Sequence, residues 1–193
     1  DIFLNVITVI WIVGITNAIN FIDGLDGLAA GVSSISLISL FTVSMITGTK
    51  SALAVSLLIA ILTGSILGFL PFNLNPAKIF MTDIGSNLLG FSLGVISIMG
   101  TLKSYTTFAL VIPIIALAFP IFDVSFAILR RIKGKKKITE ADRGHLHHRL
   151  LDVGLSQRQV VFILYFISAL TGLCSIGYLI ISKKGAVQSE AIY

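Results

Sequence analysis

The chain has 193 residues, of which 55% are hydrophobic and 12% are charged, and its mean hydropathy is +0.99. A soluble domain of this size carries about a quarter charged residues, so the composition excludes a soluble protein with a large core. The formal net charge of +5 is not accompanied by a folded basic domain, so it does not indicate a nucleic-acid partner.

Six runs without a charged residue are each at least 19 residues long, and a helix that spans the bilayer needs about 20 residues. A transmembrane β-barrel would instead show short alternating segments. We therefore predict an all-α, polytopic transmembrane helical bundle, with residues 1–193 forming one membrane domain. About six spanning helices are expected, at Ile2–Thr16, Leu28–Ile46, Ala52–Leu70, Leu88–Thr101, Thr107–Leu129 and Val160–Ile181.

The first of three polar islands, NAINFIDGLDG at 17–27, is expected in the loop after the first helix. Asn17, Asn20, Asp23 and Asp26 recur at intervals of three, so on a helix they would share one face. Amide and carboxylate oxygens are ligands that suit Mg²⁺, and polar groups beside hydrocarbon are functional candidates. Helix capping is the alternative for Asn and Asp, but four residues in register favour a function.

The second island, FMTDIGS at 80–86, stands just before the fourth predicted helix. Taken alone, Asp83 would be an N-capping residue, because a carboxylate is stabilised at the positive end of the helix dipole. The number of spans, however, puts this island on the same face of the membrane as the first one. This placement makes a metal site shared by Asp83 and Asn20 the functional interpretation.

Asp123 lies inside the fifth predicted helix, in which Pro113 and Pro120 predict kinks. Two interpretations of this carboxylate are equally supported. It either pairs with a basic residue of the same face or anchors the helix near the membrane interface. No metal role is assigned to it.

The third island, GHLHHR at 144–149, combines three histidines with arginine. No cysteine accompanies His145, His147 and His148, as many zinc sites would require, and Arg143 and Arg149 would repel a cation. Histidine mixed with basic residues instead indicates an anionic substrate. A phosphate group is favoured, because arginine can hold it with two parallel hydrogen bonds.

Six spans place all three islands on one face of the membrane. That face carries ten of the 14 Lys and Arg residues, and such an excess marks the cytoplasmic side. We therefore expect a multi-pass protein of the cell (plasma) membrane with its active-site loops in the cytoplasm. The ten residues are Lys78, Arg130, Arg131, Lys133, Lys135, Lys136, Lys137, Arg143, Arg149 and Arg158.

Three motifs together resemble those of the polyprenyl-phosphate N-acetylhexosamine-1-phosphate transferases (glycosyltransferase family 4). They are NAINFIDGLDGLAAG at 17–31, FMTDIGSNLLG at 80–90, and PIFD with RGHLHHRLL between 120 and 151. They cover essentially the whole chain in the family's order. The His-x-His-His-Arg form is similar to the WecA/TagO branch, which uses UDP-N-acetylglucosamine. The MraY branch usually has three consecutive histidines.

The resemblance implies a membrane phosphotransferase that starts the synthesis of a cell-wall or surface polysaccharide. Undecaprenyl phosphate, or another polyprenyl phosphate, would attack the β-phosphorus of UDP-N-acetylglucosamine and release UMP. Such phosphoryl transfer depends on positioning and on charge neutralisation by Mg²⁺. The implied partners are the UDP-sugar, the polyprenyl phosphate and the lipid bilayer, and a homodimer is compatible with the family.

The resemblance also implies roles for individual residues. Asn20 and Asp83 match the metal-binding positions, Asp26 matches a residue that contacts uracil, and Phe80 matches an aromatic that stacks on the base. The remaining candidates belong to the same loops. They are Asn17 and Asp23 for nucleotide binding or loop shaping, and His145, His147, His148 and Arg149 for the pyrophosphate and sugar. Asp83 and the three histidines are the catalytic candidates.

Two departures from the family pattern stand out. Thr82 occupies a position where the family usually has glycine, and the aspartate-rich motif of the family's N-terminal half is absent. The chain also begins at Asp1 and runs directly into an apolar segment. We therefore expect a C-terminal fragment of a larger transferase, with little or no activity of its own.

Three alternatives are considered. Within the family, the alternative is an MraY-like phospho-N-acetylmuramoyl-pentapeptide transferase. A membrane transporter or channel would place polar residues near the middle of several helices, whereas the islands here collect at helix ends. A CDP-alcohol phosphatidyltransferase would have an arginine after its Asp-Gly motif, and this chain has leucine there.

Overall fold

The computed structural model describes residues 2–99, 111–135 and 144–190, and within these ranges every regular element is a helix. Five of these helices are long and apolar enough to cross a membrane. The fifth predicted span, Thr107–Leu129, begins outside the described residues. The predicted multi-pass helical bundle is confirmed. Its helices are α1 (Ile2–Ile22), α2 (Leu28–Thr47), α3 (Lys50–Asn73), α4 (Thr82–Met99), α5 (Val111–Ala116), α6 (Ala118–Lys133), α7 (Leu146–Asp152) and α8 (Gln157–Glu190).

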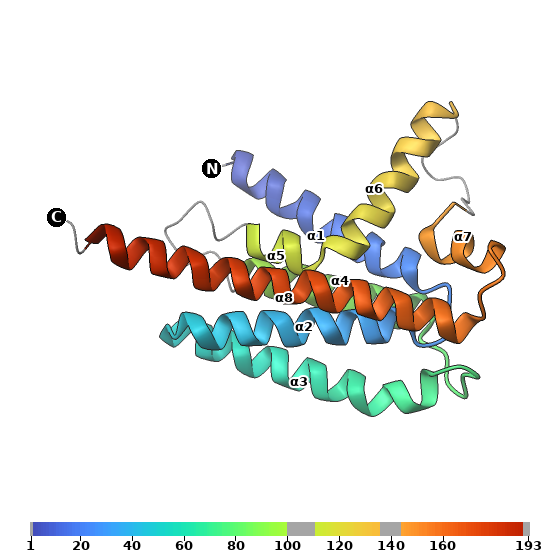
Figure 1. Cartoon of the computed structure of the whole chain (residues 1–193), viewed down its shortest axis with the longest axis horizontal. Helices are drawn as coiled ribbons and strands as arrows, with labels where there is room; N and C mark the ends of the chain where they lie inside the picture. The colour runs from blue at the N-terminus through green and yellow to red at the C-terminus, as the bar shows by residue number, and fades with distance from the viewer. Residues whose placement is uncertain (1, 100–110, 136–143, 191–193) are drawn as a thin grey trace.

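The five long helices lie roughly side by side, and α2 lies between α8 and α3 (Figure 1). Of its most apolar window, 67% is buried, against 17% for α1 and 22% for α3. The apolar side chains that α1 and α3 expose fit contact with lipid, because hydrocarbon tails are as apolar as leucine. The three polar islands belong to the end of α1, the start of α4 and α7. These three segments lie at the right-hand end of the bundle in Figure 1, as the span count predicts.

Helices α1 and α4 approach closely through two glycines spaced four residues apart on α4. A Cβ atom at Gly90 would lie 2.7 Å from Thr16 Cα, and one at Gly94 would lie 3.2 Å from Ile12 Cα. Small residues at this spacing let two membrane helices bring their backbones together. The contact fixes the end of α1 beside the start of α4, where the first two islands lie.

The islands correct several predicted helix ends. Helix α1 continues to Ile22 instead of ending at Thr16, and α4 begins at Thr82 instead of Leu88. The first half of the first island and most of the second are therefore helical. The third island, expected in a loop, forms most of the short helix α7. Helix α3 includes Pro71 in its last turn, and α8 extends beyond both predicted ends.

The fifth predicted span, Thr107–Leu129, is not one kinked helix in its described part. It breaks at Leu117 into α5 and α6, and α6 then points away from the bundle (Figure 1). Pro120 has no N–H, so the carbonyl of Ala116 loses the donor that a continuous helix would supply. The Ser36 hydroxyl of α2 donates to that carbonyl at 3.1 Å. The break is thus stabilised by a neighbouring helix.

Candidate active site

The structure brings the first two islands into contact at one pair of helix ends. Asn20, in the last turn of α1, donates through Nδ2 to Ser86 Oγ at 2.9 Å and to Asp83 Oδ1 at 3.3 Å. Asp83 lies in the first turn of α4 and is exposed, whereas Ser86 is buried one turn later. The side-chain amide oxygen of Asn20 and the exposed carboxylate of Asp83 remain as oxygen acceptors on two neighbouring side chains.

A second carboxylate lies close to this pair. Burial raises the pKa of Asp23 to about 6, and the negative charge of Asp83 adds to the increase. Two carboxylates that repel each other would be stabilised by a bound cation. The donor set of Asn20, Asp23 and Asp83 consists of oxygens, which suits Mg²⁺. Among the described residues, no three His, Cys, Asp or Glu side chains form a complete metal site. Mg²⁺ usually keeps water and substrate phosphate in its coordination shell, so it needs few ligands from the protein.

Thr82, directly before Asp83, has a backbone φ of +59°. This left-handed conformation costs a residue with a Cβ about 1–2 kcal/mol, and β-branched residues adopt it rarely. Glycine would adopt it without that cost. The position at which this chain departs from the family pattern is thus one where the backbone favours glycine.

The third island lies against the first. Within the described residues, His147 is 2% exposed and neither of its ring nitrogens has a hydrogen-bond partner. Its ring fills the space beside Gly24, where a Cβ atom would lie 2.6 Å from His147 Nε2. Burial, together with the charge of His148, lowers the pKa of His147 to about 4. The imidazole of His147 is therefore neutral at pH 7.

His145 is held by α6. Its Nδ1 lies 2.7 Å from Asp123 Oδ2, and the backbone N–H of Leu146 donates to Asp123 Oδ1 at 2.8 Å. The His145 ring also packs against Phe21 of α1, with ring centroids 5.9 Å apart. Of the two interpretations of Asp123, the structure thus supports pairing with a residue of the island face. Arg131, on the same helix, lies over the Phe21 ring.

Asp26 does not continue the polar stripe of Asn17 and Asn20. The helix ends at Ile22, so the predicted face of four residues is not formed. Asp26 Oδ2 instead accepts hydrogen bonds from Asn75 Nδ2 at 3.0 Å and from the backbone N–H of Ala77 at 3.1 Å. Asn75 also donates to Gln157 at the start of α8. This network joins the first island to the loop before α4.

The other candidates are more accessible. Phe80 is 67% exposed, Arg149 is exposed, and His148 is partly exposed. The exposed side chain of Asn17 donates to the Val13 carbonyl one turn earlier in α1. The structure therefore groups the first two islands around Asn20 and Asp83, and the buried His145 and His147 of the third island pack against the first island.

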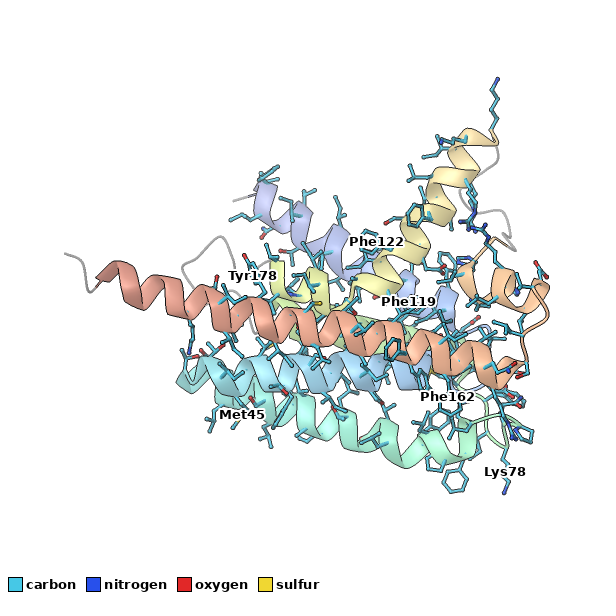
Figure 2. The ribbon with its side chains drawn as sticks, viewed as in Figure 1. Met45, Lys78, Phe119, Phe122, Phe162 and Tyr178 are labelled. Atoms are coloured by element: carbon cyan, nitrogen blue, oxygen red, sulfur yellow. The ribbon has the colours of Figure 1, made fainter. Side chains whose placement is uncertain are left out.

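Two cavities open near the islands. One, of about 260 Å³, lies between the Asp26 network and the first turns of α8, and Arg158 and Phe162 line it. The other, of about 460 Å³, lies between α6, α7 and α8. Phe119 and Phe122 line it, and both are on the α6 ribbon in Figure 2. Asp123, Arg130 and Arg149 add charged groups to the otherwise largely apolar lining of this cavity.

Three residues that contribute to the site were not among the site residues predicted from the sequence. Ser86 was part of the second island, but only its contact with Asn20 shows its place. Asn75 stands outside all three islands, and nothing in its local pattern distinguished it. Asp123 carried a usable signal, since a carboxylate inside an apolar span is a functional candidate.

The family model described as Glycosyl transferase family 4 matches residues 1–101. A Bacillus subtilis (strain 168) protein named a probable undecaprenyl-phosphate N-acetylglucosaminyl 1-phosphate transferase is 50% identical over 135 residues, which cover 70% of this chain and 38% of that protein. A decaprenyl-phosphate N-acetylglucosaminephosphotransferase of Mycobacterium leprae (strain TN) is 43% identical over 116 residues, covering 54% of this chain and 29% of that protein.

A phospho-N-acetylmuramoyl-pentapeptide-transferase of Staphylococcus saprophyticus is 36% identical over 125 residues, covering 64% of this chain and 37% of that protein. The chain therefore spans less than two fifths of the length of each of these three relatives.

Proposed function

The chain belongs to glycosyl transferase family 4, and we propose that it is the C-terminal part of a larger, Mg²⁺-dependent transferase. The intact enzyme would move N-acetylglucosamine-1-phosphate from UDP-N-acetylglucosamine to undecaprenyl phosphate or another polyprenyl phosphate. An oxygen of the lipid phosphate forms a bond to the β-phosphorus, the bond from that phosphorus to the bridging oxygen breaks, and UMP leaves. The lipid-linked product would begin a cell-wall or surface polysaccharide.

One observation carries this proposal: Asn20 and Asp83 meet across two helices, beside the carboxylate of Asp23. Residues far apart in the sequence thus supply neighbouring oxygens at the end of an apolar bundle. A polar-headed substrate with a lipid tail can reach such a place from the membrane, and a nucleotide can reach it from water. The names of the relatives support the choice of substrates.

Asn20 and Asp83 would hold Mg²⁺, with Asp23 adding negative charge close by. When bound, the ion neutralises charge on the pyrophosphate oxygens. The exposed ring of Phe80 is free to stack on uracil, and Asp26 keeps its second carboxylate oxygen for the base. Arg149 is exposed on α7 and would bind phosphate, and the partly exposed His148 precedes it in the sequence.

The islands are proposed to face the cytoplasm. Cysteines introduced at Gly134 and at Ser51 are then expected to react with a membrane-impermeant maleimide from opposite sides of the membrane. In intact cells the cysteine at position 51 should be labelled, and the cysteine at position 134 only after permeabilisation. The native Cys174 would first be replaced by serine. Labelling of both cysteines from outside would contradict the six-span topology.

The substrate is tested on the intact enzyme in detergent or nanodiscs, with UMP release as the measurement. We expect turnover with UDP-N-acetylglucosamine and a polyprenyl phosphate, and none with the muramoyl-pentapeptide nucleotide. Turnover with the second nucleotide alone would move the protein to the MraY-like branch, the weaker alternative, since the Staphylococcus saprophyticus protein is 36% identical to the chain and the Bacillus subtilis protein 50%. The 193-residue chain, run in parallel, is expected to be inactive, and robust turnover by it would contradict the proposal that it is a part of the enzyme.

A further inference from the structure

The buried carboxylate of Asp123 makes two contacts with the start of the third island. It lies in the first turns of α6 and is 6% exposed, and it receives Leu146 N–H at 2.8 Å through Oδ1 and contacts His145 Nδ1 at 2.7 Å through Oδ2. An ionised carboxylate only accepts hydrogen bonds. Nδ1 of His145 must then carry the proton, and Nε2 of a neutral ring is left as an acceptor.

From this geometry we infer that Asp123 is a positioning residue for His145, which it holds in one orientation and in the Nδ1–H tautomer. The remaining contacts of the ring agree with a fixed orientation. Phe21 packs against one part of it at 5.9 Å, and the His147 ring stacks on it with centroids 5.8 Å apart and an interplanar angle of 11°. A ring held in this way keeps the same nitrogen, Nε2, as its acceptor in every molecule. The carboxylate acts on the reaction only through the histidine.

Asparagine at position 123 separates this role from simple packing. It has nearly the same shape and can still accept the Leu146 N–H through Oδ1. Its NH₂ group, however, now faces Nδ1 of His145. Nδ1 must then be the acceptor, so the proton of the neutral ring is carried on Nε2. The backbone contact survives while the tautomer reverses.

The tautomer is measured directly by ¹⁵N NMR of histidine-labelled intact protein in lipid bilayers, with the His145 signals identified by their loss in His145→Gln. The wild-type protein should show the Nδ1–H tautomer at His145, and the Asp123→Asn variant should show the Nε2–H tautomer. An Nε2–H tautomer in the unsubstituted protein would overturn the inference without any use of a variant at Asp123. This measurement does not depend on the reaction.

The catalytic consequence rests on the proposed function and is tested by a double-mutant cycle. Asp123→Asn alone is expected to lower kcat for UMP release about 10–100-fold, with little change in KM. Loss of the carboxylate partner of a metal-bound histidine commonly has an effect of this size. In a His145→Gln background the same substitution should cost less than about threefold, because residues that act as a unit are not additive. Equal costs in both backgrounds would overturn the inference. Asp152→Asn, which changes an exposed carboxylate on α7, should leave kcat unchanged.

The two measurements separate failure of the inference from failure of the proposed function. A protein with the expected tautomers but no UMP release would retain Asp123 as the positioning residue and refute the proposed reaction. If the wild-type protein turned over fully but the Asp123→Asn variant kept the wild-type tautomer, the proposed reaction would stand and the inference about Asp123 would be refuted.

Discussion

Replacing Asp83 with asparagine in the intact enzyme is expected to slow Mg²⁺-dependent UMP release by on the order of 10²–10³-fold. The substitution keeps the size of the side chain and removes its charge. Hard cations favour carboxylate oxygen, and loss of preorganised charge stabilisation commonly costs this much in rate. The rate would be measured as a function of Mg²⁺ concentration, and half-saturation should shift to higher concentrations.

Two measurements on the Asp83→Asn variant separate a metal-binding role of Asp83 from helix capping: its thermal unfolding, and its activity compared with that of a control variant. Asp83 lies in the first turn of α4, where loss of the charge would cost only about 0.3–1 kcal/mol of helix stability, so thermal unfolding should change little. Asp152→Asn is the matched control, because Asp152 is an exposed carboxylate at the end of α7. A wild-type rate and Mg²⁺ dependence for Asp83→Asn would return Asp83 to a capping role.

Replacing Gly90 with alanine is expected to lower activity on the order of 10²-fold without touching a proposed substrate contact. The new Cβ would lie 2.7 Å from Thr16 Cα and 2.9 Å from Thr16 O, and a backbone cannot rotate away as a flexible side chain can. Helices α1 and α4 must then separate, which moves Asn20 away from Asp83. Misplacement of a reacting group by about 1 Å can cost a factor of this size, and overpacking destabilises by about 1–3 kcal/mol.

Helix α3 supplies the control for this experiment. Gly64 and Gly68 have the same four-residue spacing as the pair on α4, but a Cβ atom at either position meets nothing within 4 Å in the described structure. Alanine at Gly64 or Gly68 should therefore leave turnover and thermal unfolding unchanged. If Gly90→Ala behaved in the same way, the close helix contact would not be what holds Asn20 beside Asp83.

The fold class and the grouping of the islands could be predicted from the sequence, because both depend on properties of whole segments and not on single contacts. Apolar runs of a given length predict spanning helices, and the order of the spans assigns each connection to a face. The family resemblance, drawn from three motifs, is confirmed by the family match. That match also removes the transporter and phosphatidyltransferase alternatives. The metal and substrate roles of individual residues stay predictions.

The local structure of the islands was harder to predict, for physical reasons. Asn17 and Asn20 have low helix propensity in water, yet α1 continues through them because packing against α4 overrides that preference. The break at Leu117 depends on a hydrogen-bond donor, Ser36, that belongs to α2. The sequence of α5 and α6 alone therefore could not reveal it. The Asp26 and Asp123 contacts join segments that are distant in the sequence, so spacing alone could not reveal them.

The contact between Ser36 and the Ala116 carbonyl bears on the order in which this protein is assembled. The two residues are 80 positions apart, so Ser36 is synthesised well before Ala116. An unpaired carbonyl is costly in hydrocarbon, and Pro120 guarantees that Ala116 cannot be paired within its own helix. The break between α5 and α6 is therefore stable only in a bundle that already contains α2. During biogenesis, the segment that carries Asp123 toward the histidines can take its final direction only after the earlier helices have gathered.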